Sequence, residues 1–170
     1  MVSIAVSFLI EENGQVLVVE ESKPEILGKW DFPGGRIEQG ETLEQAVERE
    51  LKEEVGMKAE STQLIRVYEG IRDDGILGVR FQFRVKLKKG KQSEKLHEDI
   101  SSNRYITRSE LQELVDQHKV RAGLFHFTEI CDYLKGYPEQ VEIVELKDNR
   151  ECPCGSNYKY KNCHFEPLLV

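Results

Sequence analysis

The sequence predicts a domain of the α/β or α+β class, in which helices pack on the faces of a mixed β-sheet. Three observations support this prediction: several segments alternate apolar residues with period two, turn signals separate them, and helix-period segments lie between them. A chain of 170 residues is long enough for one main domain with a short appendage, and too short for two full domains. The pattern alone leaves the topology open.

The first expected element is a strand followed by a hairpin turn. Apolar residues alternate with others along it: Ile4, Val6, Phe8 and Ile10. Asn13-Gly14 is a strong hairpin signal before residues 15–21, "QVLVVEE", so two paired strands are expected here. The N-terminus lacks a basic leading segment and a small-residue cleavage site, which favours a first strand over a secretory signal peptide.

A loop over residues 22–35, which contains two prolines and three glycines, leads into a predicted helix. Thr42, with Gln45 three residues later, forms a capping-box-like start, and Gly56 is a natural stop. The helix is therefore expected over residues 43–55. Its apolar residues form one inward stripe: Leu43, Ala46, Val47, Leu51 and Val55.

Three carboxylates on this helix lie where the protein interior is expected. Glu50 and Glu54 project within the inward arc, and Glu53 lies at its edge. Carboxylates at these spacings repel one another and resist ionisation unless a positive charge sits among them. A solvated acidic helix face is the alternative interpretation. Other charged residues already supply the outward face, so a divalent cation is favoured, and Mg²⁺ suits oxygen ligands shared with substrate phosphates.

The second half of the chain predicts another hairpin and two helices. Residues 63–71 and 78–87 alternate in period two around the turn signal at 73–75. A polar stretch then precedes a short strand at 104–107, a helix over 109–119 capped by Thr107 or Ser109, and a final helix over 121–136 that ends at Gly136. Residues 140–150 are expected to be an extended or linking segment.

Composition restricts the function classes. A net charge of −7 argues against a nucleic-acid polymer as partner, although a bound cation would still permit a small anionic substrate. No apolar run approaches the length needed to span a bilayer, so no membrane association is expected. Cytoplasmic residence is the default expectation, and the four cysteines should then be reduced thiols or metal ligands.

The pattern Gly35-x5-Glu41-x7-Arg49-Glu50-Leu51-x-Glu53-Glu54-x-Gly56-Met57 resembles the complete signature of the Nudix (MutT-like) hydrolases. The preceding "GKWDFPGG" is similar to the usual lead-in to that signature, and the order of elements over residues 1–136 fits the same family. The resemblance implies a Nudix-type α/β/α sandwich with a mixed β-sheet. It also implies a pyrophosphohydrolase, which cleaves a nucleoside diphosphate linked to another group by water attack on phosphorus.

The resemblance assigns roles to individual residues. Glu50 and Glu54 would be direct ligands of Mg²⁺ or Mn²⁺, Glu53 a ligand or water-orienting group, and the Gly35 carbonyl a further contributor. Arg49 and Glu41 would form a supporting ion pair that fixes the helix against its loop.

The general base is left open between two glutamates. Glu53 can serve within the motif, and Glu98 resembles a loop glutamate that some family members use, although it could equally be a plain surface residue. Other side chains are ambiguous between substrate contact and packing or solvent exposure, and none of them assigns the substrate: Trp30, Phe81, Phe83, Arg66, Arg80 and Arg84.

The C-terminal segment predicts a second metal site. Cys152, Cys154, Cys163 and His164 offer four ligands within a short stretch, which suits structural, tetrahedral Zn²⁺ with no open position for catalysis. A peptide of this size cannot bury a core, so metal binding would supply its folding energy. Cys131, at core spacing on a helix, is expected to be simply buried.

This segment resembles the SEC-C zinc motif. The expected organisation is therefore a Nudix domain over residues 1–136, a linker over 137–150 and a SEC-C-like motif over 151–166. In that family such a tail is a small docking module for a protein partner, with Lys159, Tyr160 and Lys161 as candidate contacts.

Two functions follow from these observations. The first is an enzyme acting on a small-molecule nucleotide, with a nucleoside triphosphate or an oxidised nucleotide favoured because the domain is compact. The second is a non-catalytic Nudix-fold module that binds a nucleotide and docks a partner through the zinc tail. Because a binding module is expected to have lost acidic residues of the motif, the intact set of Glu50, Glu53 and Glu54 favours the enzyme.

Overall fold

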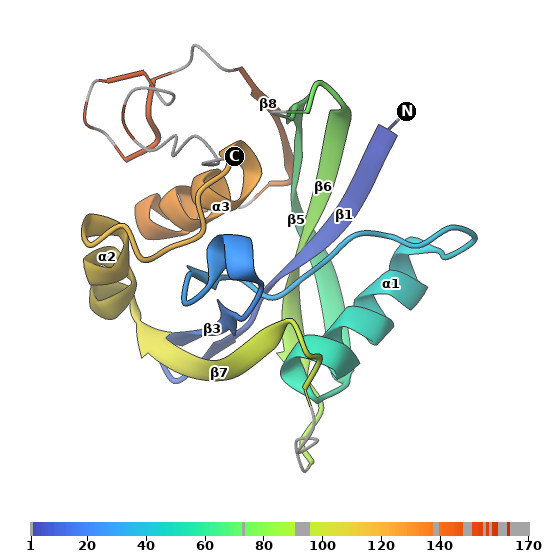
Figure 1. Ribbon diagram of the computed structural model, residues 1–170. Coiled ribbons are helices and arrows are strands. Elements are labelled where there is room, and N and C mark those ends of the chain that lie inside the picture. The colour runs from blue at the N-terminus through green and yellow to red at the C-terminus, as the bar shows by residue number, and fades with distance from the viewer. Residues whose placement is uncertain are drawn as a thin grey trace.

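The computed structural model describes residues 2–72, 74–90, 96–137, 140–147, 151–154, 156, 158, 159 and 163. Figure 1 shows the order of their elements: β1 (Val2–Leu9), β2 (Glu11–Glu12), β3 (Gln15–Glu21), η1 (Pro24–Ile26), β4 (Trp30–Asp31), α1 (Leu43–Glu50), η2 (Leu51–Val55), β5 (Ala59–Ile71), β6 (Leu77–Leu87), β7 (Ile100–Thr107), α2 (Arg108–Asp116), α3 (Leu124–Lys135) and β8 (Glu142–Leu146).

The strands form a mixed sheet and a smaller antiparallel one. The mixed sheet has the order β1-β6-β5-β8, in which β1 runs parallel to β6, β6 antiparallel to β5, and β5 parallel to β8. In the second sheet β3 pairs antiparallel with β2, β4 and β7. The predicted mixed sheet is therefore present.

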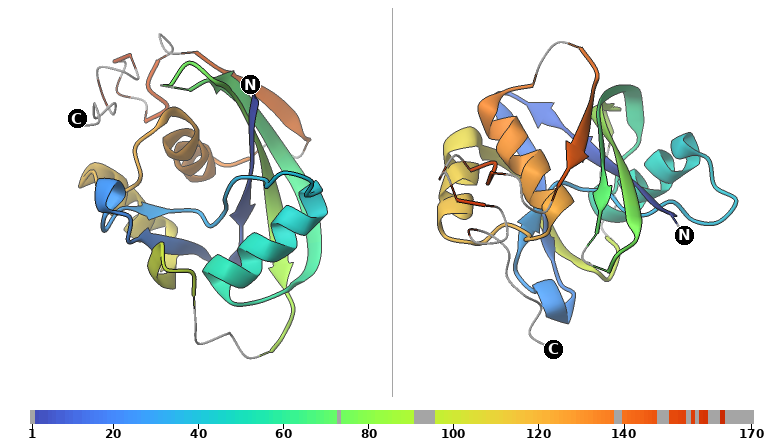
Figure 2. Two further views of the ribbon diagram at one scale, coloured as in Figure 1. Left: turned by 45° about the vertical axis from the view of Figure 1, so that its right-hand side comes forward. Right: turned by 90° about the horizontal axis from the view of Figure 1, so that it is seen from above.

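Helices cover both faces of the mixed sheet. Figures 1 and 2 show α1 on one side of β1, β6 and β5 and α3 on the other. Two apolar clusters fill the interfaces: one joins α1 and η2 to Val6, Phe8 and Val85, and the larger one joins α2 and α3 to Leu9 and Tyr68. This arrangement confirms the expected α/β/α sandwich.

The N-terminal hairpin is shorter than expected. Asn13-Gly14, both with positive φ, turns only β2 into β3, while β1 leaves to pair with β6. Residues 6–10 are all buried, because β1 lies between the two apolar clusters and is covered on both faces. The prediction that the whole first strand forms a hairpin with residues 15–21 is thus wrong.

The carboxylate helix begins and ends where its local signals predict. The Thr42 side chain accepts a hydrogen bond from the Gln45 N–H, and the Gln45 side chain accepts one from the Thr42 N–H, which completes the capping box. Gly56 ends the segment with φ 73°. The last turn, η2, is π-helical rather than α-helical, and such widened turns occur frequently at functional sites.

The later elements also follow their caps. Thr107, one of two predicted caps, begins α2 in a capping box with Glu110, and α3 ends at Gly136. The segment predicted to link the two parts of the chain contains β8, which extends the mixed sheet. No helix among the described residues is long and apolar enough to cross a membrane.

Candidate active site

Arg49 organises the acidic residues of the carboxylate helix. Its Nε and Nη2 donate to the two carboxylate oxygens of Glu41, at 2.9 and 3.0 Å, in a bidentate pair. Its Nη1 donates to Glu50 at 2.8 Å and to Glu53 at 3.1 Å, and Nη2 also reaches the Arg36 carbonyl at 2.9 Å. One guanidinium thus fixes three of the predicted site carboxylates and joins the helix to the preceding loop.

The Gly34-Gly35 turn contacts the carboxylates of Glu54 and Glu50. The Gly34 N–H donates to Glu54 Oε2 at 2.7 Å. A Cβ at Gly35 would lie 2.1 Å from Glu50 Oε1, so only glycine allows this carboxylate to approach the backbone. The Gly35 carbonyl accepts the Val6 N–H at 2.9 Å, and a carbonyl oxygen can accept from or bind a second partner.

The electrostatics of the cluster favour a cation. Burial raises the pKa of Glu50, against the opposing effect of Arg49. Burial raises the pKa of Glu54 well above its usual value, and the nearby Glu50 carboxylate adds to this effect while the Gly34 N–H opposes it. A bound cation would relieve the cost of ionising both side chains.

The donor set fits a magnesium-type ion in chemistry, since it offers only oxygen atoms. Arg49 holds this cluster, but one oxygen from each of Glu50, Glu53 and Glu54 cannot be chosen so that all three lie within 4.8 Å of one another. Among the described residues, only the three C-terminal cysteines have ligand atoms that close together. The Glu53 side chain is 37% exposed and is held by Arg49 Nη1 at 3.1 Å.

The loop that carries Glu98 contacts the carboxylate helix. The His97 N–H donates to the Glu53 carbonyl at 2.7 Å, which fixes the loop beside η2. Ser22 Oγ donates to the Glu98 carbonyl at 2.6 Å, and the Glu98 residue is exposed. The structure therefore brings Glu98 near the cluster through its backbone, while its assignment as general base stays a prediction.

A buried network of charges was not predicted from the sequence. On α3, the Glu129 carboxylate accepts hydrogen bonds from Ser7 and from Arg80 Nη1, the latter at 2.9 Å. His126 Nδ1, also on α3, contacts the Asp31 carboxylate on β4, and Arg80 Nη1 lies 3.0 Å from the same nitrogen. The network joins the helix to the strand that leads into the Pro-Gly-Gly turn.

The network shifts several pKa values. Burial raises the pKa of Glu129 to about 7, against the attraction of Arg80. Burial, with the positive charges of Arg121 and Arg80, lowers the pKa of His126 to about 3. Burial opposes the ionisation of Asp31, but contact with His126 and the nearby Arg121 and Arg80 guanidinium groups outweigh it and lower the pKa. The network therefore favours the ionised form of Asp31.

Glu21 extends this network towards the carboxylate helix. Arg121 Nη1 donates to Glu21 Oε1 at 2.6 Å, while Glu21 Oε2 is buried with no hydrogen-bond partner among the described residues. Burial raises the pKa of Glu21, and the nearby Asp31 carboxylate adds to the effect. No local pattern marks these residues, because each stands alone in its strand or loop and they meet only in the fold.

The structure shows the surroundings of the aromatic and basic side chains that the sequence left open between substrate contact and packing or solvent exposure. Trp30 is 8% exposed and lies in the apolar core with the Arg104 guanidinium 4.3 Å from its ring centre, which fits a packing role. Arg66 and Arg80 are buried and paired with acidic residues, and Arg84 faces solvent. Phe81 and Phe83 are half-buried.

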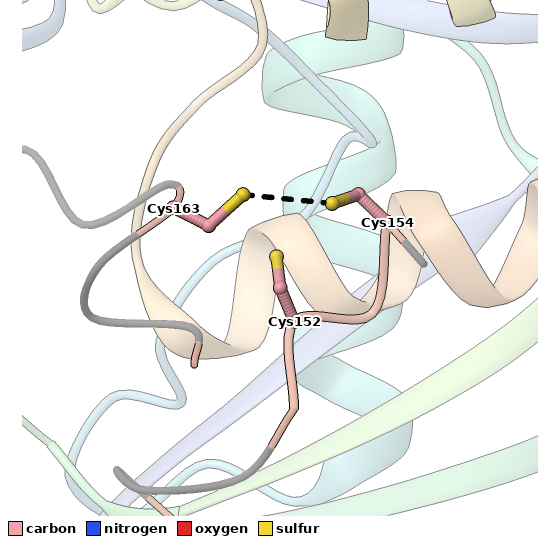
Figure 3. A group of neighbouring side chains, drawn as sticks. All are labelled: Cys152, Cys154 and Cys163. Atoms are coloured by element: carbon pink, nitrogen blue, oxygen red, sulfur yellow. Dashed lines mark hydrogen bonds between the residues drawn. The ribbon is translucent and has the colours of Figure 1, made fainter. Parts of the chain in front are cut away.

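The three C-terminal cysteines converge. Figure 3 shows the side chains of Cys152, Cys154 and Cys163 pointing toward one another, and their sulfur atoms lie within 4.8 Å. The Cys154 and Cys163 sulfurs are 3.7 Å apart, close to the roughly 3.8 Å that tetrahedral Zn–S bonds of about 2.3 Å require. The thiols therefore fit zinc. The fourth predicted ligand, His164, lies outside the described residues, as do Tyr160 and Lys161.

Comparisons with known proteins agree with this geometry. Family models match residues 1–128 as a NUDIX domain and residues 149–166 as a SEC-C motif. The chain is 34% identical over 143 residues to phosphatase NudJ of Escherichia coli K12, covering 83% of this chain and 89% of NudJ. A solved NUDIX hydrolase from Nitrosomonas europaea is 27% identical with a TM-score of 0.68, covering 82% of this chain and 94% of that one.

A shorter match links the chain to a larger human protein. Over 80 residues it is 39% identical to the human 8-oxo-dGDP phosphatase NUDT18, which covers 47% of this chain. The chain spans only 24% of the length of that relative.

Proposed function

Since the chain belongs to the Nudix family of hydrolases, enzymes that act on phosphoric anhydride bonds, we propose that it is a Mg²⁺-dependent pyrophosphohydrolase. Its substrate is a nucleoside diphosphate linked to another group, and a nucleoside triphosphate or an oxidised nucleotide is favoured. The oxygen of a water molecule forms a bond to phosphorus, the anhydride P–O bond breaks, and the leaving phosphate keeps the electron pair of that bond on its oxygen. Mn²⁺ is the alternative ion.

The observation that carries this proposal is the contact between the buried Glu50 carboxylate and the backbone of Gly35. The Arg49 guanidinium offsets part of the charge of this enclosed carboxylate, but Glu53 adds to the cost of ionising it and Glu50 adds to the cost of ionising Glu54, and a divalent cation would offset these costs. All three glutamates are present, so the site retains the oxygen ligands that such an ion needs.

Each residue has a distinct task in this mechanism. Glu50, Glu53 and Glu54 would hold Mg²⁺, together with the Gly35 carbonyl, and the ion would neutralise the phosphate oxygens and the charge that develops during displacement. Glu53 or Glu98 would accept the proton of the attacking water.

The ion pair between Arg49 and Glu41 positions the acidic side chains rather than touching the reacting atoms. Arg49 Nη1 already bridges Glu50 and Glu53, so these carboxylates are held close together before any ion binds. Preorganisation of this kind lowers the cost of assembling the site when substrate arrives.

The name of one relative favours a nucleotide substrate. NUDT18 is described as an 8-oxo-dGDP phosphatase, and its match covers 47% of this chain. The compact domain, without a large inserted segment, favours a substrate of similar size. Cytoplasmic residence and the domain limits 1–136, 137–150 and 151–166 remain proposals.

The C-terminal motif has a structural role in this account. Cys152, Cys154, Cys163 and His164 would hold Zn²⁺ with all four positions filled, which leaves none for water or substrate. A protein partner docking through this tail is part of the proposal, with Lys159, Tyr160 and Lys161 as candidate contacts.

A substrate panel tests the proposal. Release of phosphate or pyrophosphate is measured with Mg²⁺ across nucleoside triphosphates, oxidised nucleotides, ADP-ribose, dinucleoside polyphosphates and nucleotide sugars. One nucleotide substrate should stand well above the rest and require the metal. No turnover on any compound, combined with a nucleotide that still raises the melting temperature, would replace the enzyme with the nucleotide-binding module.

A further inference from the structure

The chain is fixed to the hydrolase domain just before the cysteine cluster begins. β8 pairs with β5 from Arg66↔Glu142 to Gly70↔Leu146. Gly70 permits this approach, because a Cβ there would lie 2.7 Å from the Leu146 carbonyl oxygen. Leu146 is buried and lies six residues before Cys152, so even an extended chain keeps the cluster within about 20 Å of it.

Arg66 ties β8 to α3. The buried guanidinium donates from Nη1 to Asp132 on α3 at 2.6 Å and from Nη2 to Glu142 on β8 at 3.0 Å. It also lies 5.1 Å from the ring centre of Tyr137, which follows α3. The strand that leads to the cluster and the helix beside it are therefore joined by one buried side chain.

The cysteine cluster turns its buried side toward α3. Cys152 is 3% exposed and belongs to the same apolar cluster as Cys131 of α3, itself 3% exposed, and Leu146. Cys154 and Cys163 pack against that cluster, whereas Tyr158 is 65% exposed. Figure 3 shows the three thiols beside a helix of the hydrolase domain, and Figure 2 places the tail next to α3.

The same helix also carries part of the buried charge network described above. Glu129 lies two residues before Cys131 and holds Arg80 and Ser7, and His126 contacts Asp31 just ahead of the Pro-Gly-Gly turn. α3 therefore touches the cysteine cluster with one part of its surface and the buried charge network with another.

We propose that the cysteine cluster is a metal-dependent clamp on the hydrolase domain itself, not an independent module on a flexible tether. Zinc held by Cys152, Cys154 and Cys163 fixes the tail against α3, so tail and hydrolase core unfold as one cooperative unit. This inference concerns the stability of the domain and does not depend on which nucleotide is hydrolysed.

The single tryptophan makes a direct test possible. Trp30 lies in the hydrolase domain, far along the chain from the tail, so its fluorescence reports the melting of that domain. The full-length, zinc-loaded protein is compared with the same protein after chelation. If zinc is present at about a thousandfold above its dissociation constant, the Trp30 melting temperature should fall by about 10 °C when it is removed.

Two variants sharpen the comparison. Cys154→Ser removes a thiol of the cluster and should melt like the chelated protein, with no further response to chelator. Tyr158→Ser changes an exposed residue of the same tail and should keep the full zinc effect. Hydrogen exchange should show loss of protection along α3 when zinc is removed, and the slowest-exchanging amides of the rest of the core should lose protection as well, because the core unfolds with the tail as one unit.

A zinc-bound protein whose Trp30 transition is unchanged by chelation, or by Cys154→Ser, would establish an independent tail and overturn the clamp. Failure of the full-length protein to bind zinc, measured by metal analysis, would overturn it equally.

Discussion

The approach of Glu50 to Gly35 allows the metal site to be tested with a single methyl group. Gly35→Ala places a Cβ 2.1 Å from Glu50 Oε1, and ordinary contact begins at 3.4 Å, so the carboxylate must retreat by about 1.3 Å. Gly35 has no positive φ, hence alanine fits its backbone without strain. The change therefore acts on the position of the carboxylate rather than on the fold of the turn.

A displacement of this size has a predictable effect. Misplacing a catalytic group by about 1 Å can cost about 10²-fold in rate, so we expect kcat/KM to fall by about that factor. The concentration of Mg²⁺ needed for half-maximal activity should rise as well, because the displaced group is a proposed ligand. Overpacking should cost about 1–3 kcal/mol of stability, which leaves the protein folded.

Steady-state kinetics across Mg²⁺ concentrations, with melting temperature as the check on folding, provide the assay. Gly90→Ala is the matched control, since a Cβ there meets no atom of the described part of the chain within 4 Å. A Gly35→Ala protein that is folded and turns over like the parent, with the same metal requirement, would refute the placement of Glu50 in the metal site.

Three other predictions follow from the site. Because the pKa of Glu129 is raised to about 7, the folded protein binds its proton more tightly than the unfolded chain, so stability should fall by about 3 kcal/mol as pH rises from about 4.5 to 7. Glu129→Gln should flatten this fall in melting temperature, and an unchanged slope would contradict the assignment. Arg49→Lys loses the fork that grips Glu41 and should lower kcat/KM by about 10–100-fold with unchanged circular dichroism; full activity would show that the pair is dispensable. Glu98→Gln should lower kcat by about 10²-fold or more with little change in KM, whereas parent-like turnover would leave Glu53 as the base.

Local signals explain why the carboxylate helix could be predicted from the sequence. Thr42 and Gln45 form the capping box, and Gly56 is the left-handed residue that ends the segment. Both signals involve residues that are close together in the sequence. The inward position of Glu50 follows from the same helical period. The π-helical turn after Glu50 has no such local signature, and the sequence did not predict it.

Non-local pairing explains the failures. The pairing of β1 with β6 joins segments more than seventy residues apart, while the Asn13-Gly14 turn is equally compatible with a longer hairpin. The arginines Arg66 and Arg80 look solvent-facing on their strands, because the acidic partners that allow their burial come from α3. Burial of a charge depends on its partner, and one segment of sequence does not contain both.

The cysteine tail has one feature that its local sequence predicts and one that depends on non-local pairing. The three thiols lie close in sequence, so their convergence follows from their spacing. Their position against α3 depends on β8, which pairs with a strand about seventy-five residues earlier and was expected only as a linking segment.

Mg²⁺-dependent turnover of the best nucleotide substrate by Glu53→Gln, measured beside Glu48→Gln, tests the central claim most directly. Glu53 belongs to the carboxylate cluster, whereas Glu48 is exposed on α1, so each variant removes one negative charge from the same helical segment. Glu53→Gln should stay folded and lose at least about 10²-fold in kcat, while Glu48→Gln should behave like the parent. Parent-like turnover by Glu53→Gln, or an equal loss in both variants, would contradict the assignment of this cluster as the catalytic metal site.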